Sequence, residues 1–323
     1  MPYTPLDVTE VASLIDDDVA LVKLCNFQRM ALSSSPTQSG FRVFALLFFE
    51  TSSLPGIQLV EGSNTEPSYI GGSICAERAA LSKLRMFSDP KMVKLVVTTD
   101  SGEPISPGLL CREYIFSHAD SSLPIVFGDG ASSTVVSCSI EKLYPFPFAY
   151  RRVLGNNIGD VGRALSSTLL PRDEYPVESG WNEDIEQCYT LALRATESDK
   201  SPIHPLKLGA CVQYLDGSRE VAWQLKGLEY GCTLDPVCQL IRGMLLDCQK
   251  NAPLFLCMVD QFGIAHAPFA QARALLSEHG FGSLLVAVHT VADGVLTPCV
   301  TSVADLAPSP TGRLLTSKDL LPC

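Results

Sequence analysis

The sequence predicts an α/β protein made of two tandem α/β/α layered domains, each with a mixed sheet flanked by helices. Three observations lead to this prediction. The chain has 323 residues, which is long enough for two domains with a core each. Helical and strand-like apolar patterns alternate along it. The order of these patterns repeats with a period of about 160 residues.

The two copies begin in the same way. The first has a helical pattern over residues 7–32, a polar loop (SSSPTQSG) and then the apolar strand FRVFALLFFE. The second has the capped helical segment NEDIEQCYTLALRAT, the loop ESDKSPIHP and then the strand LKLGACVQYLDG. In both, a short apolar strand follows an aliphatic helix and a loop that contains Pro and Ser.

The correspondence continues downstream, where GGSICAERAALSKL aligns with GCTLDPVCQLIRGML and ISPGLLCREYIFSHA aligns with AHAPFAQARALLSEHG. Four pairs of positions carry the chemical comparison, with the first copy named first: Cys75 and Asp235, Glu77 and Val237, Gly108 and Phe269, Cys111 and Ala272. Side chains that could hold a metal or move protons occur mainly in the first copy. The second copy is therefore interpreted as a duplicated scaffold without a site.

The predicted boundaries follow from this repeat. Residues 1–155 form the first, catalytic domain, and residues 182–323 form the degenerate second domain. Residues 156–181 lie between them and are rich in turn and helix-breaking residues, so they are predicted to be a linker.

Charge and composition exclude several classes of protein. The formal net charge is -11, with 24 Lys and Arg against 35 Asp and Glu. Nucleic-acid binding depends on neutralising phosphates with a basic surface, so a small-molecule ligand is favoured over nucleic acid. No apolar run approaches the roughly 20 residues of a membrane span, and the N-terminus lacks the basic and apolar regions of a signal peptide. The sequence therefore predicts a cytoplasmic protein that does not bind membranes.

Two helix starts in the first copy carry cysteines. Cys75 and Glu77 lie in the first turn of the predicted helix ICAERAALSKLRMF, and Cys111 lies in the opening turn of a helix that starts near Pro107. The positive end of a helix dipole lowers the pKa of a thiol placed there. Two such thiolates predict a zinc site with Glu77 beside it as proton carrier, and zinc lowers the pKa of a bound water to about 7. The alternative is that these cysteines are inert core residues, as most of the twelve are expected to be.

These segments resemble motifs of the cytidine deaminase family. Cys75-Ala76-Glu77 is similar to the family's first motif, [HC]-A-E. The stretch SNTEP resembles the substrate-binding motif N-x-E-N, with Asn64 and Glu66 matching and a proline replacing the final Asn.

The resemblance extends from Phe41 to Phe148. The segment FRVFA is similar to the family's strand F-x-V-G-A, with Phe44 in place of Gly, and LYPFPF is similar to its L-L-P-x-x-F tail. The repeat resembles the two-domain members of the family, which carry a degenerate C-terminal copy. The final segment, SKDLLPC, looks like a shortened form of the same tail.

The resemblance implies a cytidine-deaminase-like fold in both copies and a hydrolase that converts cytidine or deoxycytidine to uridine or deoxyuridine in pyrimidine salvage. One zinc ion per chain is expected. The implied roles are as follows: Cys75 and Cys111 bind zinc, Glu77 shuttles protons, Asn64 and Glu66 bind the ribose, and Phe41 and Phe148 wall the base. Phe148 is expected to reach a neighbouring site, which implies a homodimer with two live sites.

One position departs from the family. Its second motif is P-C-x-x-C, but this chain has Gly108 where the middle cysteine is expected. Catalytic zinc sites normally have three protein ligands. His118 is about 10 Å along the helix from Cys111 and is too far to replace it, whereas Cys138 could approach only through the fold. The alternative function is therefore a catalytically impaired protein that binds a nucleoside or acts as a structural subunit.

Overall fold

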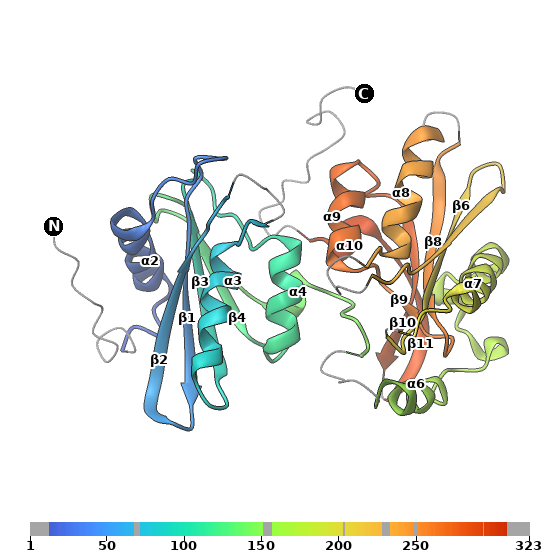
Figure 1. Ribbon diagram of the computed structural model, residues 1–323, viewed down its shortest axis with the longest axis horizontal. Helices are drawn as coiled ribbons and strands as arrows, with labels where there is room; N and C mark the ends of the chain where they lie inside the picture. Colours follow the sequence, from blue (N-terminus) through green and yellow to red (C-terminus); the bar gives the residue numbers. More distant parts are fainter. Residues whose placement is uncertain are drawn as a thin grey trace. The chain divides into compact units, whose positions relative to one another are not determined.

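The computed structural model describes residues 13–67, 72–150, 157–202, 204–227, 233–247, 251–292 and 294–308. Within these residues the chain divides into two compact units, one ending at Tyr144 and the other running from Pro145 to Pro308. Each unit has a mixed β-sheet with helices on both faces (Figure 1). The predicted α/β fold class is confirmed. None of the helices in the described residues combines the length and the apolar composition that a bilayer span requires.

The first unit contains a five-stranded sheet with the order β2-β1-β3-β4-β5. β3 and β4 are parallel, and the other neighbouring strands are antiparallel. Helix α2 covers one face, and α3 and α4 cover the other (Figure 1). The elements are α2 (Asp18–Leu32), β1 (Val43–Thr51), β2 (Leu54–Ser63), α3 (Ala76–Lys83), β3 (Lys91–Thr99), α4 (Leu109–His118), β4 (Pro124–Gly128), β5 (Val135–Ser139) and α5 (Ile140–Leu143).

Strand β1 lies inside this sheet, and its sequence is almost continuously apolar because both of its faces are covered. Phe44, Leu46 and Phe48 pack with Leu21 and Cys25 on the α2 side. The residues between them point to the opposite face, toward α3, because side chains alternate along a strand. The Phe44 side chain that replaces the family's Gly is therefore a core residue on the α2 side.

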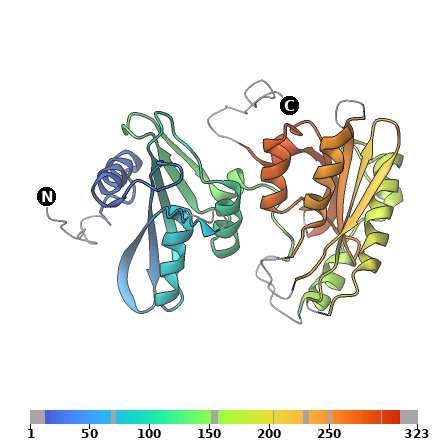
Figure 2. The ribbon, with the colours of Figure 1, turned by 45° about the horizontal axis from the view of Figure 1, so that its top comes forward.

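The second unit contains a sheet with the order β11-β10-β8-β6-β7, and β9 pairs with β8. α7 covers one face, and α8, α9 and α10 cover the other (Figure 2). The elements are α6 (Ile158–Ser166), α7 (Glu183–Ala195), β6 (Leu208–Tyr214), β7 (Arg219–Trp223), α8 (Pro236–Asp247), β8 (Pro253–Asp260), β9 (Ala265–His266), α9 (Ala270–Glu278), β10 (Leu285–Ala292), β11 (Val295–Ser302) and α10 (Val303–Leu306).

The same pattern of backbone hydrogen bonds recurs within each unit, at the positions that the sequence repeat pairs. An isolated bridge joins Thr65 to Ile74 ahead of α3, and another joins Leu225 to Leu234 ahead of α8. The parallel pair of strands also recurs, as β3 with β4 and as β8 with β10. The repeat in the sequence therefore corresponds to a repeat in the fold.

Each unit contains a buried arginine that donates equivalent hydrogen bonds to backbone carbonyls. In the first, Arg112 donates from Nε to the carbonyl of Pro107 at 2.6 Å and from Nη1 to that of Leu143 at 2.9 Å. In the second, Arg273 donates from Nε to Pro268 at 2.7 Å and from Nη1 to Leu306 at 3.1 Å. Leu306 is therefore the structural counterpart of Leu143. The final SKDLLPC segment, which the sequence suggested as a second tail, lies outside the described residues.

The segment predicted as a linker differs from that expectation in its described part, residues 157–181. Helix α6 lies in it and packs into the second unit through Ile158, Val161 and Leu165, whose spacing places them on one helix face. Further along, Leu170 N donates to Leu296 O at 3.1 Å. The boundary between the compact units lies after Tyr144, because Phe146, Phe148 and Tyr150 pack into the hydrophobic clusters of the second unit.

Candidate metal centre

The starts of α3 and α4 bring three potential ligands together. Cys75 is the N-cap residue of α3, Glu77 lies in its first turn, and Cys111 lies in the first turn of α4. The two sulfur atoms and a carboxylate oxygen of Glu77 all lie within 4.8 Å of one another. The predicted grouping of these residues is therefore present in the structure. It is the only such cluster of His, Cys, Asp or Glu found among the described residues.

The Cys75 and Cys111 thiols are joined by a hydrogen bond. A hydrogen bond from Cys111, supported by Arg78, lowers the pKa of Cys75 to about 5. The same hydrogen bond and burial raise the pKa of Cys111. Arg78 Nη2 lies 3.5 Å from the Cys75 sulfur. The pair therefore holds a single proton between two sulfur atoms, and a bound cation would replace that proton.

Glu77 is buried, with only 4% of its surface exposed. Burial raises its pKa to about 7, and the nearby charge of Cys75 acts in the same direction. A carboxyl group with a pKa near neutrality can both accept and donate a proton under working conditions. Glu77 therefore has the properties of a general acid–base group.

A cavity of about 420 Å³ opens over this cluster. Five of the seven residues predicted for the site line it: Phe41, Asn64, Glu66, Cys75 and Glu77. The Cys111 sulfur lies in the cluster beneath. The seventh residue, Phe148, belongs to the second unit and lines a different cavity there.

Asn64 and Glu66 are held by local hydrogen bonds at the cavity wall. Asn64 Oδ1 accepts from Val43 N at 2.8 Å, and its Nδ2 donates to Phe41 O at 2.8 Å. Glu66 accepts from the backbone and the hydroxyl of Ser39, both at 2.8 Å, and these bonds lower its pKa. Asn64 thus fixes the strand end that carries Phe41, and Glu66 presents a charged carboxylate to solvent.

Gly108 lines the same cavity. It is the N-cap residue of α4, with φ -63° and ψ 156°, a conformation open to any residue. A Cβ atom built on it would meet no other atom within 4 Å. The space that a third thiolate would occupy is therefore open. Cys138, the residue that the sequence left as a substitute, lies on β5 outside the cluster.

The donors fit zinc in kind and in spacing. Thiolate and carboxylate are both zinc ligands, and two donors of one tetrahedral ion lie roughly 4 Å apart. Cys75 and Cys111 would hold the ion, and Glu77 stands beside them. Arg78 offsets the negative charge of the thiolates, a role that the sequence analysis missed. Its position three residues after Cys75, on the same helix face, was the available signal.

The second unit lacks an equivalent cluster in the residues that the structure describes. Asp235, which pairs with Cys75, accepts from the backbone of Val237 at 2.7 Å and of Cys238 at 2.9 Å. It is therefore the N-cap of α8. Val237 and Ala272 are buried apolar residues in the core. The predicted asymmetry between the copies is present in the structure.

No protein-family model matches this sequence, and no curated protein matches it. Comparison with solved structures finds cytidine deaminases. That of Burkholderia pseudomallei is 25% identical, with a TM-score of 0.34, and the similarity covers 40% of this chain and 97% of that one. Those of Mycobacterium tuberculosis and Mycobacterium leprae are 23% and 22% identical, each with a TM-score of 0.33, covering 41% and 40% of this chain and all of their own.

Proposed function

We propose that this chain is a zinc-dependent hydrolase that deaminates cytidine or deoxycytidine to uridine or deoxyuridine, as an enzyme of pyrimidine salvage. The observation that carries the proposal is the convergence of Cys75, Glu77 and Cys111 beneath a cavity of about 420 Å³. Bound zinc would supply an activated water for attack on the carbon that bears the amine.

The chain's own residues account for the proton transfers. Hydrolysis replaces the exocyclic amine of cytosine with a water oxygen and releases ammonia. Glu77 takes a proton from the attacking water and delivers it to the ring nitrogen, and it serves again when the amine leaves. Its pKa of about 7 suits both directions of transfer. Burial keeps bulk water away from this carboxyl group.

The cavity wall suits a nucleoside. Phe41 offers an apolar ring to the base, while Glu66 offers a carboxylate that accepts hydrogen bonds from ribose hydroxyls. Asn64 positions both of them through its bonds to Phe41 O and Glu66, the latter at 3.3 Å. Ser39 fixes the Glu66 carboxylate from the other side. This part of the site would therefore orient a sugar and a flat base.

Gly108 favours a second candidate function, a protein that binds a nucleoside without turnover or serves as a subunit. With Gly at this position, two thiolates instead of three are available, and catalytic zinc normally has three protein ligands. Weak zinc binding would leave the cavity and its polar wall intact. Such a protein would retain nucleoside affinity and lose the chemistry.

Turnover of cytidine, followed by the loss of its absorbance, tests the proposal. The wild type, Glu77→Gln and the exposed control Glu103→Gln are compared with added zinc. The proposal expects activity in the wild type and control, and a loss of about 10³-fold or more in Glu77→Gln because a general acid–base group is removed. No turnover in the wild type, together with cytidine binding by calorimetry, would replace it with the second candidate.

A further inference from the structure

The second unit retains a cavity of its own although its metal ligands are absent. Its volume is about 430 Å³, within the range of small-molecule sites, roughly 300–1,000 Å³. Two of its lining residues, His266 and Ala267, directly precede Pro268, as Ile105 and Ser106 precede Pro107 at the first cavity. The two cavities thus occupy related places in the two units, and they share no lining residue.

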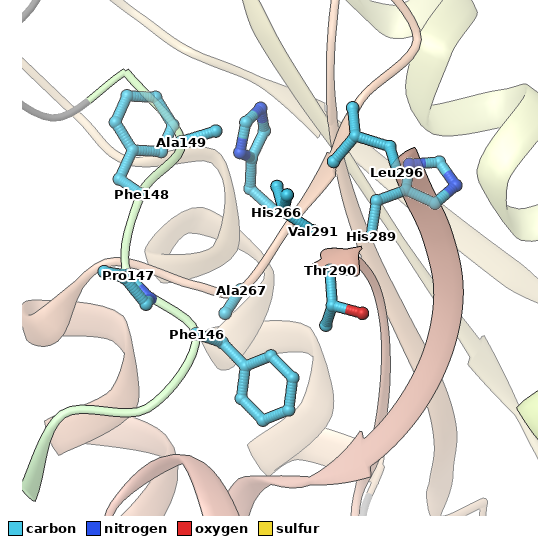
Figure 3. A pocket seen from close by; sticks show the side chains of 10 residues that line it. All are labelled: Phe146, Pro147, Phe148, Ala149, His266, Ala267, His289, Thr290, Val291 and Leu296. Atoms are coloured by element: carbon cyan, nitrogen blue, oxygen red, sulfur yellow. The ribbon is translucent and has the colours of Figure 1, made fainter. Parts of the chain in front are cut away.

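The walls of this cavity are mainly aromatic and apolar. Figure 3 shows Phe146 and Phe148 on the loop at one side, and His289 and Thr290 on the end of β10 at the other. The Phe148 ring lies 4.7 Å from that of His266 and 4.8 Å from that of Phe269, between ring centroids. None of the described residues that line the cavity is Lys, Arg, Asp or Glu.

A buried carboxylate fixes the orientation of His266. Asp260 accepts from His266 Nε2 at 2.8 Å and from the Tyr150 hydroxyl at 2.6 Å. It also accepts from the backbone of Phe262 and Ile264, at 2.8 and 3.0 Å. With four donors around a fully buried side chain, Asp260 remains ionised. His266 must therefore carry a proton on Nε2.

The other ring nitrogen of His266, Nδ1, is then an acceptor in the neutral ring. Among the described residues, none forms a hydrogen bond with this Nδ1 atom. It is also absent from the inaccessible polar atoms that lack a partner, so Nδ1 is accessible. It is consequently available at the cavity. His289 is different, because its Nδ1 accepts from Ala265 N at 2.9 Å and its ring stacks on Trp181 with a 5° interplanar angle. His289 therefore serves mainly as a flat wall.

We propose that this cavity is a second binding site, which takes an uncharged, planar heteroaromatic molecule that carries an N–H group, such as a free nucleobase. The rings of Phe148 and His289 offer flat faces for stacking, and His266 Nδ1 accepts the ligand's N–H. A phosphorylated ligand is disfavoured because the lining offers no cation to pair with it. This inference does not rest on the proposed function, since it concerns the other unit.

Histidine side-chain NMR tests the proposal on the full-length protein. The chain has five histidines, so their ring ¹⁵N signals form a simple spectrum, and Nδ1 of His266 reports directly on a new hydrogen bond. The probes are uracil and 1,3-dimethyluracil, which has the same ring but no N–H. We expect a saturable shift with uracil and roughly tenfold weaker binding of the dimethyl compound.

A blocking variant tests the location. Val291 lines the cavity and is 64% exposed, so Val291→Trp can fill the opening without entering the core. Val221→Trp is the matched control, an exposed valine on β7 of the same sheet. Val291→Trp should abolish the His266 shift, and Val221→Trp should retain it. The proposal is overturned if uracil leaves His266 unchanged, if both probes bind equally, or if Val291→Trp binds uracil like the wild type.

Discussion

Replacing Gly108 with Cys should create the third thiolate of the metal centre. The added Cβ atom meets no other atom within 4 Å, and the backbone, with φ -63°, accepts any side chain. Gly is a better N-cap than most apolar residues, so replacing it costs about 0.5–1 kcal/mol of stability. The substitution also reduces the conformational entropy of the unfolded chain, which stabilises the folded state by about the same amount. The free energy of unfolding should therefore stay close to that of the wild type.

The expected gain in zinc affinity is large. Structural zinc sites with four ligands bind with about 10–16 kcal/mol, which is about 2.5–4 kcal/mol per ligand. One added thiolate next to Cys75 and Cys111 should lower the zinc dissociation constant by about 10²–10³-fold. Competition with a chromogenic chelator measures this constant, and X-ray absorption counts the sulfur ligands, which should rise from two to three.

Two matched variants isolate the role of the new thiol. Gly108→Ala adds the Cβ atom without sulfur and should leave zinc affinity unchanged. Gly102→Cys adds a thiol at another glycine with open space around it, outside the cavity, and should also leave it unchanged. If Gly108→Cys bound zinc no more tightly than Gly108→Ala, position 108 would not face the metal, and the reasoning about the two helix starts would be refuted.

Further predictions concern stability and assembly. Asp260→Asn should lower the free energy of unfolding by about 3 kcal/mol, because a buried carboxylate with two side-chain donors is lost. In the wild type, burial opposes ionisation of Asp260, but the bonds from His266 and Tyr150 outweigh it and lower its pKa below 3.8. The contribution of ionised Asp260 to the free energy of unfolding is therefore present above pH 3.8 and is lost as the pH falls through the pKa of the folded state. In urea titrations the difference in the free energy of unfolding between the wild type and Asp260→Asn should narrow below about pH 4. A constant difference down to about pH 2 would contradict this. Phe48→Ala should cost about 3–5 kcal/mol because the ring is buried against α2, whereas the exposed control Phe27→Ala should change urea stability by less than about 0.5 kcal/mol. Light scattering should give a homodimer of about twice the 34.9 kDa chain mass, and a monodisperse monomer would contradict the predicted assembly.

The metal cluster could be predicted from the sequence because its signals are local. A cysteine at a helix start and a glutamate two residues later define their own geometry once the helix forms. The structure places Cys111 in the first turn, as the pattern indicates, and Cys75 just before the first turn, at the N-cap. The convergence of the two helices could not be derived from either segment alone. The two helix starts together suggested it, and the family resemblance added support.

The roles of Phe148 and of residues 157–181 depend on contacts that local patterns do not encode. The tail motif predicted that Phe148 walls the base of a neighbouring site, and within this chain the structure places Phe148 beside His266 and Phe269 in the second unit. The turn-rich stretch hides the helical spacing of Ile158 and Val161, which pack against the second core. In both cases the partners include residues more than 100 positions away, His266 for Phe148 and Ile264 for Ile158, beyond the reach of a local pattern.

The zinc stoichiometry of the purified protein shows whether Cys75 and Cys111 hold a metal ion. Plasma mass spectrometry is applied to the wild type, to Cys75→Ser/Cys111→Ser, and to Cys138→Ser as the control outside the cluster. We expect close to one zinc per chain in the wild type and the control, and none in the double variant. A wild type that holds no zinc even after incubation with the metal would contradict it, as would a double variant that binds zinc as well as the wild type does.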